Sequence, residues 1–237
     1  MIGRTPHARR APSAGRPAAL RAGLRLAGGL KVGLYGGTFD PPHEGHRHVA
    51  EEARRRLGLD RVIWLVTPGN PLKTLRPTSR LAERIALARR GVRGPTWSVS
   101  DIETRIGSRY TVDTVRWLRA RYPAVRFVWI MGADSLASFH LWKGWADLAA
   151  EVPIAVISRP HVALRSRFSP MARRFAGARL PVARAASLAT SPAPAWIYIP
   201  APFRYVSSTA LRDSDLKSLG ARAIKGTDFS IEAPPDP

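Results

Sequence analysis

Cysteine is absent from this 237-residue chain, and long apolar runs are absent as well. Without cysteine the chain forms no disulfide, no thiolate nucleophile and no cysteine-ligated zinc site. Without a run of about 18 apolar residues, no transmembrane helix and no membrane partner are expected. Together these absences favour a protein of a reducing, cytoplasmic compartment. Hydrophobic residues make up 45% of the chain and charged residues 23%, as in a globular protein that buries a core.

Acidic residues are scarce relative to basic ones, 17 against 38, so the formal net charge is +21. Almost all of the basic residues are arginine, which with abundant Ala, Gly and Pro is also what a GC-rich genome produces. A basic chain attracts polyanions, so nucleic acid is one alternative partner. Single-strand binding needs aromatic side chains interleaved with the arginines, and no such run occurs. We favour a small phosphate-rich substrate, which benefits from the same field.

Both ends of the chain differ in composition from its middle. Residues 1–29 carry six arginines and no acid, and their weak periodicity predicts a disordered or loosely helical extension. A mitochondrial targeting sequence has a similar composition, but a solvated tail or an over-extended start site is favoured. We expect the folded domain to occupy residues 30–225, with an irregular, partly helical insertion at 160–194. Residues 226–237 are expected to form a frayed tail.

Short apolar runs rich in Val, Ile, Trp and Tyr alternate with helical patterns, as buried parallel strands do. The expected strands are Lys31–Tyr35, Arg61–Val66, Arg126–Met131, Ile154–Ile157 and Trp196–Ile199. The expected helices are His46–Leu57, Ser79–Arg90 and Thr111–Arg121, the last with Val112, Val115, Trp117 and Leu118 as its buried stripe. This alternation predicts an α/β fold, a doubly wound, Rossmann-like parallel sheet with helices on both faces. Right-handed crossovers then bring the loops after the strands to one edge, where ligands bind.

The loop after the first expected strand combines glycine, hydroxyl and imidazole groups over Gly36–His46, GGTFDPPHEGH. Adjacent Gly36 and Gly37 allow positive φ and a close approach of a ligand to the backbone. His43 and His46 are three residues apart where a helix is expected to begin. Their rings can therefore face one side, beside free helix N–H groups that favour an anion. The loop predicts a phosphate cradle.

Zinc binding and a purely structural histidine pair are the alternatives for this spacing. Zinc needs a third ligand, the pattern is not the HExxH of metalloproteases, and His48 is expected at the surface. The loop also lacks the Lys-Ser/Thr ending of a P-loop, which argues against ATP hydrolysis by that route. The strand and the glycines before the histidines favour the phosphate cradle, and no protein metal ligand is predicted.

The string GLYGGTFDPPHEGH closely resembles the first motif of the (H/T)xGH nucleotidyltransferase superfamily, and it is most like that of bacterial nicotinate-nucleotide adenylyltransferases. The similarity extends from about Lys31 to Arg212 through four further segments. It implies a nucleotidyltransferase-type fold and a reaction of NAD biosynthesis. In that reaction ATP adenylylates nicotinate mononucleotide, giving deamido-NAD and pyrophosphate, and Mg²⁺ arrives with the ATP.

The resemblance also assigns roles to individual residues. It places His43, His46 and Arg212 in catalysis. ATP and its phosphates are expected on Gly36, Gly37, Thr38, Phe39, Gly132, Asp134, Arg159, Ser207, Ser208 and Thr209. The mononucleotide is expected on Asp40, Asn70, Lys73, Tyr110, Thr111 and Trp142. In this assignment the backbone near Tyr110 and Thr111 receives the pyridine carboxylate, and Trp142 stacks on the ring.

Three of these assignments have a basis in local chemistry too. Ser207–Arg212 predicts a helix start with hydroxyls at its N-cap and a guanidinium one turn later, which makes a second polyphosphate grip. Thr111 is expected to cap its helix. Lys73 is expected to steer the acceptor, although many relatives have a double proline and a histidine at this point. Trp117 and Trp129 are expected in the core.

Two other functions stay open at this point. Within the superfamily, AMP or CMP transfer to nicotinamide mononucleotide or phosphopantetheine shares the histidine and SST motifs, and only the aromatic segments favour nicotinate. A non-catalytic basic nucleic-acid-binding protein is the alternative from another class. It predicts salt-sensitive polyanion binding with no release of pyrophosphate from ATP. The sequence does not predict an oligomeric state.

Overall fold

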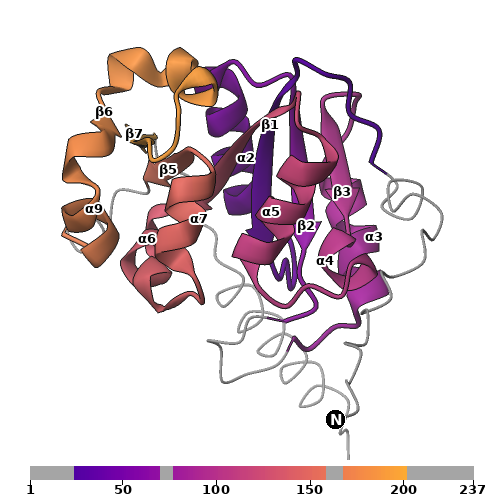
Figure 1. The fold of residues 1–237 in the computed structure, drawn as a ribbon. Coiled ribbons are helices and arrows are strands. Elements are labelled where there is room, and N and C mark those ends of the chain that lie inside the picture. Colours follow the sequence, from indigo (N-terminus) through magenta and orange to yellow (C-terminus); the bar gives the residue numbers. More distant parts are fainter. Residues whose placement is uncertain (1–23, 70–76, 159–167, 202–237) are drawn as a thin grey trace, which may run out of the picture.

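The computed structural model describes residues 24–69, 77–158 and 168–201 (Figure 1). Its strands form one sheet in the order β3-β2-β1-β4-β5-β7-β6, and every hydrogen-bonded pair is parallel. The predicted doubly wound α/β fold is therefore confirmed. The strands are β1 (Lys31–Gly37), β2 (Arg61–Val66), β3 (Trp97–Ser100), β4 (Arg126–Gly132), β5 (Ile154–Ser158), β6 (Arg179–Leu180) and β7 (Trp196–Pro200).

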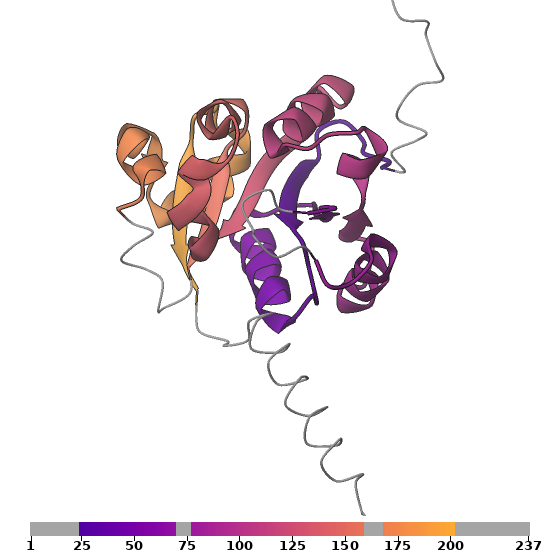
Figure 2. The ribbon, with the colours of Figure 1, turned by 90° about the horizontal axis from the view of Figure 1, so that it is seen from below.

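Helices cover both faces of the sheet (Figure 2). One face packs against α2 (Glu44–Leu57), α3 (Leu81–Gly91) and the 3₁₀ segment η4 (Val182–Thr190). The other face packs against α5 (Thr111–Arg121), α6 (Ala133–Ser138), α7 (Trp145–Glu151) and α9 (Pro170–Arg174). The remaining short helices are α4 (Ile102–Arg105), η1 (Phe139–Leu141) and η3 (Ala176–Ala178).

Successive residues of the central strands enter opposite layers of the core. On β4, Trp129 belongs to the layer beneath α5, whereas Val128 and Ile130 belong to the layer above α2. Side chains at successive positions of a strand point to opposite faces, and here both faces are covered by helices. This is why the strands appear in the sequence as continuous apolar runs.

The expected elements differ from the observed ones mainly at their ends. Helix α2 begins at Glu44, two residues before the expected start, because His43 already takes the extended N-cap conformation. Helix α3 begins two residues later than expected and ends one residue later. Helix α5 has the expected bounds. Within α5, Trp117 was predicted to be buried but is only half-buried. Thr114, which was not predicted to be buried, is fully buried.

Strands β3 and β6 were not predicted. Strand β3 is a four-residue edge strand, Trp-Ser-Val-Ser, whose side chains are mostly half-buried, so it lacks a continuous apolar run. Strand β6 has only two residues. It lies in the region expected to be an irregular insertion, of which residues 168–194 are described. This part buries Met171, Ala172 and Leu188 against the core, and β6 pairs with β7.

None of the helices in the described ranges is long and apolar enough to cross a membrane.

Candidate active site

A cleft of about 470 Å³ opens at the carboxyl ends of β1 and β4. These neighbouring strands are the point where the strand order reverses, since the chain runs from β1 outward to β2 and β3 and then returns to β4. Ligands of open α/β sheets bind at such a switch point. Nine predicted site residues line the cleft: Gly36, Gly37, Thr38, His46, Tyr110, Thr111, Gly132, Asp134 and Trp142.

Other predicted site residues are not among those that line it. Phe39 and Asp40 are buried behind the cleft, and His43 lies against the His46 ring, as described below. A further seven fall outside the described residues, namely Asn70, Lys73, Arg159, Ser207, Ser208, Thr209 and Arg212. The second phosphate grip and the lysine of the acceptor side therefore stay predictions.

Gly36 and Gly37 end β1 and make room for two aromatic rings. A Cβ on Gly36 would lie 2.6 Å from the Trp129 ring, and one on Gly37 would lie 3.0 Å from the Phe39 ring. Both glycines belong to the strand, and neither uses the positive φ that glycine allows. The left-handed backbone is at Phe39 instead, with φ 48°. The glycines thus let the rings approach the backbone at the edge of the cleft.

His46 lines the cleft in a fixed orientation. The backbone N–H of His43 donates to Nδ1 of His46 over 3.2 Å. Since Nδ1 accepts, a neutral His46 ring carries its proton on Nε2, which leaves Nε2–H as the donor. The edge of the Phe39 ring packs on the imidazole, with centroids 5.0 Å apart. His46 is thereby presented as a preorganised hydrogen-bond donor in the first turn of α2, beside the helix N–H groups.

The other imidazole, that of His43, lies directly against the His46 ring, with centroids 3.8 Å apart. His43 is the N-cap residue of α2, and its carbonyl accepts from the backbone N–H of His46 over 2.9 Å. The two rings do face one side, as the three-residue spacing predicts. Only His46 lines the described cleft, so the direct contact of His43 with a phosphate stays a prediction.

Asp40 and Phe39 are the buried residues of this loop. The Asp40 carboxylate is 6% exposed and accepts from the backbone N–H and the hydroxyl of Thr78, at 2.7 and 3.0 Å. Burial alone raises its pKa, but the hydrogen bonds from Thr78 and Ser79 outweigh burial and hold the pKa below its ordinary value. Phe39 is 1% exposed, so its ring is not accessible to a ligand.

Two buried charged residues of this region were missed by the sequence analysis. Arg84 of α3 is 1% exposed and donates to backbone carbonyls of the loops after β1 and β2. It stands on the apolar stripe of its helix with Leu81 and Ala88, and an arginine in that register is the signal that could have found it. Glu103 of α4 lines the cleft and is 8% exposed. Burial raises the pKa of Glu103, and a hydrogen bond with Thr67 only partly offsets this rise.

The start of α5 offers backbone N–H groups to the cleft. The N-cap residue is Tyr110, not Thr111, and no side chain caps this helix, so the expected cap at Thr111 is wrong. The Ser108 hydroxyl instead donates to the carbonyl of Tyr110 over 2.9 Å. First-turn amides of a helix lack intrahelical partners. They are therefore placed to receive an anionic group, and the Tyr110 ring, 39% exposed, stands beside them.

Across the cleft, the first turn of α6 supplies an acid, and the residue after η1 supplies an aromatic ring. Gly132 is buried, and a carboxylate oxygen of Asp134 occupies the place where a Cβ of residue 132 would stand. Only glycine therefore allows this position of Asp134. The Trp142 ring packs edge-on against Trp129 and Phe139, with centroids 6.1 and 5.3 Å away. This leaves Trp142 half-buried in a fixed orientation.

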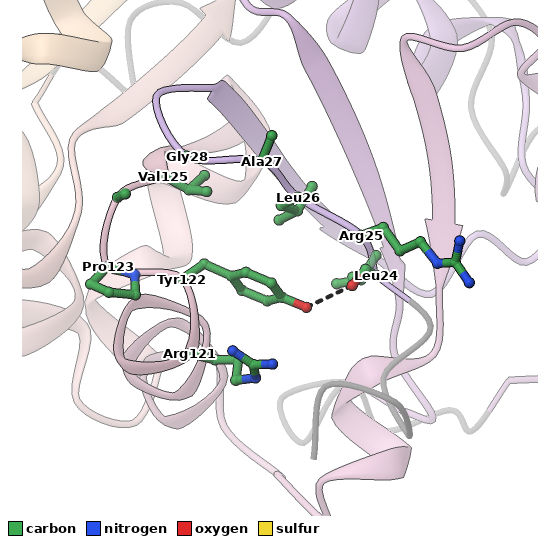
Figure 3. Close-up of a pocket in the computed structure, with 10 residues that line it drawn as sticks. Leu24, Arg25, Leu26, Ala27, Gly28, Arg121, Tyr122, Pro123 and Val125 are labelled. Atoms are coloured by element: carbon green, nitrogen blue, oxygen red, sulfur yellow. Dashed lines mark hydrogen bonds between the residues drawn. The ribbon is translucent and has the colours of Figure 1, made fainter. Parts of the chain in front are cut away.

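A second hollow, of about 870 Å³, lies at the opposite end of the sheet (Figure 3). Its walls are residues 24–28 and 121–125, which precede β1 and β4. The hydroxyl of Tyr122 donates to the carbonyl of Leu24 over 2.7 Å and joins the two walls. Leu24 is buried there, so packed structure begins before Lys31, the expected start. This hollow holds none of the predicted site residues.

Comparison with known proteins agrees with this geometry. The family model described as cytidylyltransferase-like matches residues 34–214. A protein of Caulobacter sp. (strain K31) named probable nicotinate-nucleotide adenylyltransferase is 61% identical over 188 residues, which cover 79% of this chain and all of that protein. This chain belongs to the nicotinate-nucleotide adenylyltransferase family. A relative of the same name from Cereibacter sphaeroides is 54% identical over 77% of this chain and 96% of its own length.

Among solved structures, nicotinic acid mononucleotide adenylyltransferase of Plasmodium falciparum complexed with NaAD has a similar fold. The TM-score is 0.58 at 16% sequence identity, with 85% of this chain and 98% of that chain covered. A second structure of the Plasmodium enzyme, complexed with APC, gives a TM-score of 0.57 at 15% identity, with the same coverage of the two chains. At such low identity this likeness shows the shared fold.

Proposed function

We propose that this chain transfers the adenylyl group of ATP to the 5′-phosphate of nicotinate mononucleotide and releases pyrophosphate. One observation carries the proposal. Thr38 and His46, which are expected on the phosphates, and Trp142, which is expected on the pyridine ring, line one cleft at the switch point of the sheet. The family of relatives at 50 to 61% identity, all named probable nicotinate-nucleotide adenylyltransferase, supports the same activity.

The reaction needs neither a general base nor a covalent intermediate. An oxygen of the acceptor 5′-phosphate attacks the α-phosphorus of ATP, and the bond from that phosphorus to the bridging oxygen of the β-phosphate breaks. The nucleophile is already an anion at neutral pH, and pyrophosphate carries away the electron pair. Catalysis therefore rests on holding the two substrates in line and on stabilising the charge that develops on the phosphates.

On the ATP side, His46 and the first turn of α2 supply that stabilisation. The Nε2–H of His46 is held by the contact of Nδ1 with the backbone of His43, so little reorganisation is needed as charge grows. Thr38 adds its hydroxyl at the same edge of the cleft. Asp134 is suited to accept hydrogen bonds from ribose hydroxyls, and Gly132 leaves room for it.

On the acceptor side, the uncapped start of α5 and the Trp142 ring fit a flat ring with a carboxylate. The backbone N–H groups at Thr111 favour a negative group, and an aromatic face stacks on the pyridine. Arg109 and Lys143 line the same cleft and add positive charge there. This chemistry favours the acid over the amide, because a neutral carboxamide gains less from the helix terminus.

Mg²⁺ enters this proposal as part of the ATP complex. We assign no protein ligand to it. Mg²⁺ prefers phosphate oxygens and waters in nucleotide sites. We propose that the reaction takes place in the cytoplasm. The absence of cysteine fits such a reducing compartment.

The test is pyrophosphate release by the purified protein with ATP and Mg²⁺, comparing nicotinate mononucleotide with nicotinamide mononucleotide and with phosphopantetheine. We expect release that depends on the acceptor and is fastest with the nicotinate compound. Equal or faster release with nicotinamide mononucleotide would overturn the acceptor assignment. No release with any acceptor, together with tight binding of RNA or DNA, would favour the nucleic-acid alternative instead.

A further inference from the structure

We propose that Arg84 is a positioning residue that fixes the distance between the two loops on the phosphate side of the cleft. The proposal rests on the proposed adenylyl transfer for its catalytic consequence. Its structural content depends only on the contacts of this one side chain. Arg84 itself does not line the cleft, so it acts through the loops that do.

The guanidinium of Arg84 donates to four backbone carbonyls from three separate segments. Nη1 donates to Thr38 over 2.7 Å and to Thr67 over 2.8 Å. Nη2 donates to Pro68 over 3.3 Å, and Nε donates to Ser79 over 3.2 Å. The loop after β1, the loop after β2 and the start of α3 are thus joined at one planar group.

Two of these acceptors belong to residues that line the cleft, Thr38 and Thr67. The guanidinium does not line the cleft, so it holds their carbonyls from behind. Only Thr67 has a second tie to the neighbouring loop, since its N–H donates to the carbonyl of Gly37 over 3.0 Å. Within the described residues, the hydrogen bond from Arg84 is the one that joins the Thr38 carbonyl to the loop after β2 and to the segment before α3.

A buried carboxylate completes this assembly. Asp40 accepts from the N–H and the hydroxyl of Thr78, next to the Ser79 carbonyl that Arg84 holds. Burial lowers the pKa of Arg84, and the nearby charge of Asp40 offsets only part of this fall. Arginine keeps its proton even when buried, so both side chains stay charged. Arg84 and Asp40 therefore both tie the loop after β1 to the segment just before α3.

Lysine cannot replace arginine in this role. Its ammonium group has three donors on one atom, whereas these four acceptors are spread around a fork of three nitrogens. A lysine at position 84 keeps the charge near Asp40 and reaches some of the carbonyls, but it leaves others unsatisfied. Arg84→Lys therefore separates the charge of residue 84 from its geometry, and this makes it the informative variant.

The first test compares Arg84→Lys with Arg90→Lys, a matched change at an exposed position of the same helix. Both are assayed by pyrophosphate release well below their melting temperatures. We expect kcat of Arg84→Lys to fall roughly 10- to 100-fold, as for small misplacements of reacting groups, with a much smaller change in KM for ATP. Arg90→Lys should match the wild type. If the two variants have equal kcat while both are folded, Arg84 does not position the loops.

Hydrogen exchange tests the structural content without any reaction. The amides of Thr67 and Thr78 report on the two ties, because they donate to Gly37 and Asp40. We expect Arg84→Lys to speed exchange at both amides while the β4 and β5 amides keep their wild-type protection. A uniform increase over all strands would mean a role in global stability only and would overturn the proposal. If the wild-type protein released no pyrophosphate, the proposed function would be contradicted, but the result of the exchange experiment would still stand.

If Arg84→Lys does not fold, native-state exchange of the wild type decides. A guanidinium shared by three segments predicts that the Thr67 and Thr78 amides open together, with one free energy lower than that of global unfolding. Independent opening of the two amides, with different free energies, would overturn the proposal.

Discussion

The orientation of His46 comes from contacts on the side away from any ligand. The backbone of His43 fixes its Nδ1 and the Phe39 ring fixes its plane. We therefore expect the ring to need no rearrangement when a phosphate binds.

Replacing His46 by Ala should lower turnover by about 10² to 10³, the effect of removing one preorganised donor, and leave the melting temperature nearly unchanged. Steady-state pyrophosphate release measures the first quantity and thermal unfolding the second. His48→Ala is the control, since His48 lies on the same helix and does not line the cleft. Near-normal turnover of a folded His46→Ala protein would contradict the phosphate role.

Asp40 should make the stability of the fold depend on pH in the acid range. Its folded pKa lies below the ordinary value of 3.8, so the unfolded state binds protons first as pH falls. The ionised carboxylate thus stabilises the fold at higher pH, and this contribution is lost as pH falls through the folded pKa.

We expect Asp40→Asn to lower the free energy of unfolding by about 1–3 kcal/mol at neutral pH, as for a buried hydrogen-bonded group. The difference from the wild type should shrink in denaturant titrations below about pH 4. Asp113→Asn, at an exposed carboxylate of α5, serves as the control. A difference that is constant from pH 7 to the acid limit would show that the charge of Asp40 contributes nothing.

Single residues show best what the sequence does and does not predict. The nine cleft residues were predictable because each stands in a short motif next to the end of a strand or the start of a helix. Arg84 was not, because its four partners are backbone carbonyls whose meeting depends on the packing of α3. Backbone carbonyls have no identity in a sequence. The buried position of Phe39 was missed for a similar reason, since its ring stacks on Trp64 of the next strand.

At the scale of elements, the ends of β1 and β4 are matched to each other. Gly36 on β1 leaves the space that the Trp129 ring of β4 fills, and Trp129 in turn supports Trp142. The pair links the phosphate side of the cleft to the ring side. A change in volume at the end of one strand therefore reaches a side chain that faces the substrate.

Gly36→Ala should destabilise the fold by about 1–3 kcal/mol, as overpacking of a core does, and raise KM for the mononucleotide through a displaced Trp142. Gly91→Ala is the matched control, because a Cβ there meets nothing within 4 Å and Gly91 ends a helix. Ala in place of Gly at a helix position should be neutral or stabilising. Thermal unfolding and acceptor titrations distinguish the two variants. Equal stability of both would show that Trp129 moves aside without cost.

Element boundaries were predictable where the apolar periodicity was strong. Helix α5 has the expected bounds, since Thr111–Arg121 carries a clear apolar stripe. The short segments α6, η1, α7 and α9 have too few residues for a period to show. Strand β6 is defined only by its pairing with β7. Such short elements are stabilised by packing or pairing with the sheet rather than by a pattern of their own.

At the scale of the molecule, a net charge of +21 meets two anionic substrates. We expect kcat/KM to fall several-fold as added salt shortens the Debye length from about 30 to about 10 Å. The value of kcat should stay nearly constant, because charges inside the cleft are screened much less. Assays over a salt series measure this, with sucrose of matched viscosity as the control. A fall in kcat alone would mean that salt acts on the chemistry rather than on encounter.

The central strand finds its two neighbours at very different distances along the chain. The pairing of β1 with β2 begins at Val32 and Arg61, whereas its pairing with β4 begins at Lys31 and Arg126, much farther apart in the chain. A nascent chain that emerges from the ribosome can therefore satisfy one edge of β1 early, while the other waits for more than half of the protein to be made. The cost of closing that long loop makes such pairings slow. Because the cleft lies between β1 and β4, its binding surface is completed late in the folding of the domain.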